Sequence, residues 1–189
     1  MSPDSPSHAL AQTLAIGFCG GMASGKSTLA RQLSIELDAD LISFGDYVRY
    51  KAQEGGIACE REHLQNLGQH LYNQDGAQGL VEQTLLWAQP KTERHIFDGV
   101  RHIDVWRYIR SFYTRSCLVG LQVEPSDQLK RLRMRGLHTD PSIERWRSHP
   151  VEQAQTELQR MADLLLDSQL PPQVLSSAVQ TYIGCKMQD

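Results

Sequence analysis

The chain has 189 residues, which is enough for one domain with a substantial core and too few for two domains of ordinary size. Its 19 basic and 22 acidic residues give a net charge of -3 without a long run of one sign, so we expect binding neither to nucleic acid nor to a membrane through overall charge. The four cysteines form no CxxC pair and have no metal spacing, which argues against a zinc site and indicates reduced thiols in a cytoplasmic protein.

The predicted elements begin after a polar segment. Residues 1–12 are rich in Pro, Ser and Asp, as is typical of a disordered terminus, and they lack the basic segment of a signal peptide. No stretch of the chain has the apolar length of a membrane span. We therefore expect residues 13–189 to form a single domain.

Residues 20–27 read GGMASGKS and fit the Walker A pattern G-x-x-x-x-G-K-[ST]. In this pattern the glycines let backbone N–H groups surround an anion, Lys26 reaches the β- and γ-phosphates, and the Ser27 hydroxyl can bind Mg²⁺. The apolar run at 14–19 predicts a buried strand before the loop, and 27–37 predicts a helix whose N-terminus favours phosphate. The loop therefore predicts a site for ATP and Mg²⁺. Its candidate nucleotide-binding residues are Gly20, Gly21, Met22, Ala23, Ser24, Gly25, Lys26, Ser27 and Thr28.

Strands and helices alternate along the rest of the chain. Short apolar runs predict strands at 40–43, 95–99, 117–123 and 164–168. Helical spacing predicts helices at 47–54, 60–72, 75–90, 104–113, 126–135, 150–163 and 173–183. This order predicts an α/β fold with a mostly parallel five-stranded sheet, helices on both faces and ligands beyond the carboxyl ends of the strands.

An acidic residue ends the predicted strand at 95–99. Asp98 lies well downstream of the phosphate loop, where a carboxylate can hold Mg²⁺ or one of its waters. The Asp98–Gly99 pair is equally typical of a simple turn. From this pair alone, both the metal role and the turn remain open.

Several arginines follow the fourth predicted strand. Phosphoryl transfer requires cationic groups that converge on the moving phosphoryl, and arginine grips phosphate in a bidentate way. Arg131 and Arg135 share one helix face, and Arg145 and Arg147 lie in the polar connection at 136–149, from which they could close over bound substrates. The alternative for these arginines is an ordinary solvated basic surface.

Three segments resemble adenylate-kinase-like nucleoside monophosphate kinases. ISFGDYVR at 42–49 is similar to their S-T-G-D-x-x-R, FDGVR at 97–101 to D-G-F-P-R, and RLRMRG at 131–136 to R-L-x-x-R-G. The resemblance implies a P-loop NTPase fold with strand order 2-3-1-4-5, an acceptor-binding helical region at about 44–90 and a short lid at about 136–149. It also implies that Arg49 and Arg101 hold the phosphate of the acceptor and that Asp98 lies near Mg²⁺. Arg131 and Arg135 would then act on the donor nucleotide.

The sequence departs from this family around the acceptor. Phe44 replaces a hydroxyl residue that helps to recognise the acceptor base, and Asp104 and Val105 occupy the neighbourhood of the base-reading glutamine. We therefore do not expect ordinary AMP recognition. Phe44, together with Arg145 and Arg147, remains a candidate acceptor contact.

A second likeness concerns the tail and the phosphate loop. MADLLLDS at 161–168 and GGMASGKST at 20–28 resemble A-D-x-V-I-x-N and G-G-I-G-S-G-K-S-T of dephospho-CoA kinases, which phosphorylate a ribose hydroxyl. A hydroxyl acceptor needs a proton acceptor, and Asp46 is the carboxylate in a suitable place. Asp46 could equally be the N-cap of the helix expected from Tyr47.

These features predict an ATP- and Mg²⁺-dependent phosphotransferase that acts on a nucleotide or a nucleotide-like phosphorylated small molecule. Its expected catalytic residues are Lys26, Asp46, Asp98, Arg101 and Arg135. Three alternatives remain: a kinase of a hydroxyl acceptor such as dephospho-CoA, a regulatory ATPase or switch, and a nucleic-acid end kinase. A guanine-specific switch is not expected, because the chain has no N-K-x-D.

Overall fold

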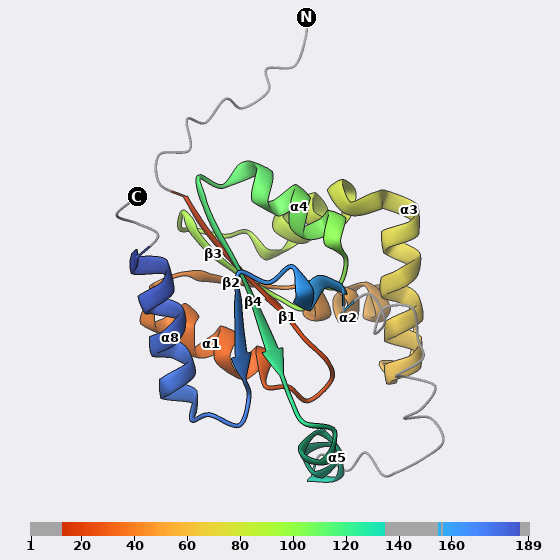
Figure 1. Ribbon diagram of the computed structural model, residues 1–189. Coiled ribbons are helices and arrows are strands. Elements are labelled where there is room, and N and C mark those ends of the chain that lie inside the picture. The colour runs from red at the N-terminus through yellow and green to blue at the C-terminus, as the bar shows by residue number, and fades with distance from the viewer. Residues whose placement is uncertain (1–12, 135–154, 156, 186–189) are drawn as a thin grey trace, which may run out of the picture.

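A computed structural model (Figure 1) describes residues 13–134, 155 and 157–185. The described residues form a five-stranded sheet in the order β2-β3-β1-β4-β5, in which every pairing is parallel. This confirms the expected strand order. The strands are β1 (Leu14–Cys19), β2 (Asp40–Ser43), β3 (Arg94–Asp98), β4 (Arg115–Gln122) and β5 (Leu164–Asp167).

Helices cover both faces of the sheet (Figure 1). They are α1 (Lys26–Glu36), α2 (Phe44–Glu54), α3 (Arg61–Ala88), α4 (Ile103–Phe112), α5 (Pro125–Met134) and α8 (Pro172–Cys185). In Figure 1, α1 and α8 lie on one side of the strands, α2, α3 and α4 lie on the other, and α5 lies beyond the end of β4. No helix in the described ranges is long and apolar enough to cross a membrane.

The sheet separates two hydrophobic clusters because successive side chains of a strand point to opposite faces. Ala15 and Cys19 of β1 belong to the cluster that α2, α3 and α4 cover. Ile16 and Phe18, which alternate with them, belong to the cluster that α1 and α8 cover. Burial of β1 on both faces explains why its sequence reads as a continuous apolar run rather than an alternating one.

Helices α2 and α3 differ from the predicted helices. The first is α2, which begins at Phe44 rather than Tyr47, because the Ser43 hydroxyl accepts the Asp46 N–H at 3.1 Å and caps the helix. The second is α3, which joins the helices expected at 60–72 and 75–90. Gly76 interrupts it with φ 67° and ψ −175°, so two helical stretches do meet near the expected place.

Candidate functional site

The phosphate loop occupies the turn between β1 and α1. Gly20 has φ +137°, and a Cβ at this position would lie 2.5 Å from the Leu121 carbonyl oxygen. Gly25 has φ +93° and is the N-cap of α1, where no side chain caps the helix within the described residues. No acidic side chain lies in the first turn of α1, so the partial positive charge of this helix N-terminus favours an anion held in the loop.

The side chain of Lys26 lies across this loop. Its Nζ donates to the Gly21 carbonyl at 2.8 Å and lies 3.5 Å from the Ser24 hydroxyl, which is fully buried. Ser27 and Thr28 follow in the first turn of α1 and are exposed. A phosphate bound in the loop would exchange the carbonyl partner of Lys26 for phosphate oxygens, which make stronger charge-assisted hydrogen bonds.

Helix α5 contacts the phosphate loop through two side chains. Gln128 Nε2 donates to the Met22 carbonyl at 2.8 Å, and Arg131 Nη1 donates to the Ala23 carbonyl at 3.2 Å. The same guanidinium donates to the Ser168 hydroxyl and carbonyl, at 3.1 and 2.7 Å. Arg131 therefore joins the phosphate loop to the turn after β5. The sequence analysis singled out Arg131 but not Gln128.

Asp98 is the last residue of β3 and is buried among the strand ends. Its Oδ1 atom is buried and has no hydrogen-bond partner among the described residues. A buried carboxylate oxygen without a donor is unfavourable unless a cation or a water molecule satisfies it. Asp98, at the same edge as the phosphate loop, therefore fits a role beside Mg²⁺ with the Ser27 hydroxyl as a second oxygen ligand.

A pocket of about 430 Å³ lies between α2, α3 and the loop after β3. We call it the α2–α3 pocket. Its polar and aromatic lining includes Phe44, Arg49, Arg61, Gln65, Arg101 and His102. The structure thus brings together the predicted acceptor residues Phe44, Arg49 and Arg101. The sequence analysis missed the contributions from α3, although Arg61 and Gln65 are four residues apart and so share one helix face.

Asp46 does not line this pocket. Its carboxylate forms an ion pair with the Arg49 guanidinium one helical turn away. Its possible role as the N-cap of α2 is wrong, because Ser43 caps that helix and Asp46 is its third residue. Asp46 therefore orients Arg49, which lines the pocket.

The pocket lining also has an apolar part and one buried amide. Phe44 is buried and stacks on Phe97, with ring centroids 6.2 Å apart. Gln65 is only 7% exposed, yet its buried Nε2 atom has no hydrogen-bond partner among the described residues. The pocket therefore combines cationic groups with an apolar wall, as small-molecule sites commonly do.

His102 forms part of the pocket lining and stacks on Tyr72, with parallel rings whose centroids are 3.8 Å apart. Burial lowers the pKa of His102 below its ordinary value of 6.5, so the imidazole is neutral at neutral pH. The Tyr72 hydroxyl donates to the Asp104 carboxylate, a bond that raises the pKa of Tyr72 to about 12. Asp104 lies in the neighbourhood where the resembling family has a base-reading glutamine. In this chain its carboxylate accepts a hydrogen bond from Tyr72.

Three predicted arginines lie outside the described residues: Arg135, Arg145 and Arg147, together with the expected lid at 136–149. Their roles stay predictions. The two groups that the structure does place, the phosphate loop with Asp98 and the α2–α3 pocket, both lie at the carboxyl ends of the strands.

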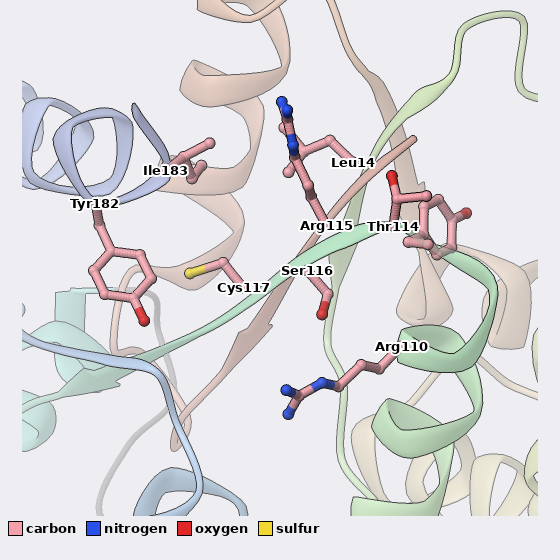
Figure 2. A pocket seen from close by; sticks show the side chains of 9 residues that line it. Leu14, Arg110, Thr114, Arg115, Ser116, Cys117, Tyr182 and Ile183 are labelled. Carbon is pink, nitrogen blue, oxygen red and sulfur yellow. The ribbon is translucent and has the colours of Figure 1, made fainter. Parts of the chain in front are cut away.

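A second pocket of about 250 Å³ lies at the opposite edge of the sheet, beside the amino ends of β1 and β4. Figure 2 shows Arg110 and Arg115 extending in different directions around it, with Ser116 between them and Tyr182 on α8. It contains none of the predicted site residues, so the candidate site is the carboxyl edge alone.

Comparison with known proteins agrees with this geometry. A family model described as AAA domain matches residues 19–145, which is more than half of the chain. The UPF0200 protein MJ1399 of Methanocaldococcus jannaschii is 25% identical over 130 residues, 67% of this chain. These residues match 65% of that relative, so the chain spans less than two thirds of its length.

Two solved structures share the fold. Shikimate kinase from Aquifex aeolicus superposes with a TM-score of 0.55 at 17% identity, covering 88% of this chain and 94% of that one. A gluconokinase from Sinorhizobium meliloti superposes with a TM-score of 0.52 at 16% identity, covering 86% and 87%. At these identities the likeness shows the P-loop kinase fold and not the substrate.

Proposed function

We propose that this chain, which belongs to the AAA domain family and has the P-loop kinase fold, transfers the γ-phosphoryl group of ATP to a small anionic molecule. One observation carries the proposal: an arginine-lined pocket lies at the same edge of the sheet as the phosphate loop. A regulatory ATPase needs the phosphate loop but has no need of a second anion site beside it.

On this proposal, the donor half of the site is the phosphate loop. Backbone N–H groups of the loop and of the α1 N-terminus bind the phosphates, and Lys26 neutralises charge on the β- and γ-phosphates. Arg131 holds the loop against the turn at Ser168 and so keeps the loop in place for the nucleotide. Mg²⁺, when bound, supplies further charge neutralisation, and Ser27 and Asp98 are the residues that would hold it.

The acceptor half is the α2–α3 pocket. Arg49, Arg61 and Arg101 present guanidinium groups that suit a phosphate or carboxylate, because each can bind such an anion in a bidentate way. The anion is thereby fixed and the attacking oxygen of the acceptor is oriented toward the γ-phosphate. Such positioning supplies much of the catalysis in phosphoryl transfer.

The acceptor that we propose is a nucleotide or a nucleotide-like phosphorylated small molecule, whose apolar or planar part would lie against Phe44. The names of the structural neighbours, shikimate kinase and gluconokinase, support a second candidate, a kinase of a hydroxyl acceptor that is not a nucleotide. For a hydroxyl acceptor a proton acceptor is required, and Asp46, held beside Arg49, is the candidate.

The test combines purified protein, ATP and Mg²⁺ with a panel of acceptors. The panel contains nucleoside monophosphates, dephospho-CoA, phosphorylated sugars, shikimate and gluconate, and ADP formation is measured. We expect one class of acceptor to stimulate ADP formation. Arg101→Ala should lower this stimulation by about 10- to 100-fold, the cost of one charged hydrogen-bonding group, while ADP still binds.

Arg107→Ala is the matched control, because Arg107 is an exposed arginine of α4 outside the pocket lining. It should retain the stimulation. A protein that hydrolyses ATP equally with every member of the panel, or whose stimulation survives Arg101→Ala, would contradict the proposal.

A further inference from the structure

One glutamine side chain joins the phosphate loop to the loop that follows β3. Gln155 Oε1 accepts the Gly20 N–H at 2.7 Å, and Gln155 Nε2 donates to the Val100 carbonyl at 3.0 Å. Both bonds are buried, and Gln155 itself is only 4% exposed. The two ends of a single carboxamide therefore bridge backbone groups that lie far apart in the sequence.

Both backbone groups border the reacting centre. Gly20 opens the phosphate loop, and Val100 lies between the carboxylate at Asp98 and the acceptor arginine at Arg101. The Val100 N–H donates to the Phe18 carbonyl at 3.1 Å, so the peptide groups on both sides of this residue are held. Gln155 therefore adds a side-chain link between the phosphate loop and residues 99–102, which we call the acceptor loop, to the direct backbone bond between Val100 and Phe18.

Gly20 is packed closely against Leu121 of β4 and the Gln159 side chain. The Leu121 carbonyl would lie 2.5 Å from a Cβ at Gly20, and the Gln159 amide would lie 3.2 Å from it. Gln159 is four residues from Gln155, but its Nε2 donates to the Leu121 carbonyl at 2.8 Å, and among the described residues it has no hydrogen bond to residues 99–102. The two glutamines therefore have different roles: Gln155 links the phosphate loop to the loop after β3, and Gln159 forms a hydrogen bond with β4.

We propose that Gln155 is a positioning residue for phosphoryl transfer, which rests on the function proposed above. It fixes residues 99–102 relative to the phosphate loop. When a bound nucleotide orders Gly20, the two hydrogen bonds of Gln155 therefore order residues 99–102 as well. The carboxamide suits this task because it offers a donor and an acceptor in one rigid plane. Removing it leaves the Gly20 N–H and the Val100 carbonyl buried without their partner.

The test is hydrogen–deuterium exchange of the full chain with and without Mg·ADP. In the wild type, we expect exchange in residues 99–102 to slow by at least about fivefold when Mg·ADP binds. Gln155→Met, which has similar length and no hydrogen-bonding amide, should bind Mg·ADP but lose this response. Gln159→Met is the control and should keep it.

A second variant covers the case in which Gln155→Met fails to fold. Gln155→Glu retains an oxygen for the Gly20 N–H but places an acceptor opposite the Val100 carbonyl, so it should also lose the response. Retention of the response in either folded Gln155 variant would overturn this inference, as would a wild type that binds Mg·ADP without any change at 99–102. Failure of the wild type to bind Mg·ADP would overturn the proposed function and this inference with it.

Discussion

Ser43 and Asp98 are paired in register at the carboxyl ends of β2 and β3. Ser43 caps α2, which lines the α2–α3 pocket, and Asp98 pairs on its other side with Phe18, next to the phosphate loop. The strand register therefore places the buried carboxylate at the border between the two halves of the site.

The unpartnered oxygen of Asp98 predicts opposite effects on stability and activity. Asp98→Asn should leave the free energy of unfolding unchanged or raise it by about 1 kcal/mol, because one oxygen of the Asp98 carboxylate is buried and accepts no hydrogen bond from a described residue. If Asp98 holds Mg²⁺ as proposed, the same change should lower Mg²⁺-dependent turnover by about 100-fold or more, because an amide is a poor ligand for this cation. Urea unfolding and ADP formation across a Mg²⁺ titration measure the two effects.

Asp40→Asn is a matched control for Asp98→Asn. The Asp40 carboxylate accepts bonds from the backbone of Lys91 and from the backbone and hydroxyl of Thr92. Its neutralisation should therefore cost about 1–3 kcal/mol without a specific effect on Mg²⁺ dependence. If Asp98→Asn were as destabilising as Asp40→Asn, the Asp98 carboxylate would be a structural group.

Gly20→Ala should lower the free energy of unfolding more than the same substitution at a glycine that has a positive φ but open space around it. The new Cβ would lie 2.5 Å from the Leu121 carbonyl, and φ is +137°. We expect a loss of more than about 2 kcal/mol, measured by urea unfolding. Gly56→Ala isolates the backbone cost, because Gly56 has φ +64° and open space around it, and it should lose about 1 kcal/mol. Equal losses in the two variants would show that the Leu121 contact has no energetic role.

Arg131 should support nucleotide binding through the contacts that hold the phosphate loop. Arg131→Ala removes the donors to Ala23 and Ser168 and should weaken binding of Mg·ADP by about tenfold, measured by calorimetry. Arg133→Ala, in an exposed arginine of the same helix, should change the affinity by less than about twofold. An unchanged affinity in Arg131→Ala would mean that the contacts of Arg131 with Ala23 and Ser168 do not contribute to nucleotide binding.

His95 should make stability depend on pH. Its Nε2 lies 2.8 Å from the Thr92 carbonyl and so carries the proton, which leaves Nδ1 to accept the Tyr113 hydroxyl. Burial lowers the pKa of His95 below 6.5, so the folded chain binds the second proton less readily than the unfolded chain. The stability that neutral His95 contributes is therefore fully present above the unfolded pKa near 6.5. It is lost as the pH falls from that value through the lower pKa of the folded chain.

Urea unfolding between about pH 7 and about pH 5 measures this effect, above the range in which carboxylates titrate. We expect the free energy of unfolding to fall with pH in the wild type and to fall less in His95→Gln. A residual slope should remain, because burial lowers the pKa of His102 in the same direction. Identical slopes in the two proteins would contradict the assignment.

Much of the fold could be predicted from local patterns. The apolar runs marked all five strands to within two residues, because each strand is short and most are buried by helices. The start of α2 was wrong, although Ser43 and Asp46 have the spacing of a helix N-terminal capping pair. That signal could have placed the helix start three residues earlier.

The site was less predictable because some of its contacts join distant segments. The phosphate loop has a contiguous pattern, and Arg49 and Arg101 follow recognisable segments. Gln155 has no such pattern, since its partners are backbone groups 135 and 55 residues away. Arg61 and Gln65 reach the pocket only through the packing of α3 against α2 and α4.

The central claim is that the phosphoryl group leaves ATP for a molecule bound beside Arg101, and transfer of label from γ-³²P-ATP tests it most directly. Wild-type protein, Mg²⁺ and labelled ATP are incubated with the small-molecule fraction of a cell extract, and the products are separated. We predict a labelled organic species that Arg107→Ala forms at the wild-type rate and Arg101→Ala forms at least about tenfold more slowly. Label that appears only as inorganic phosphate, in equal amount for the three proteins, would contradict the account.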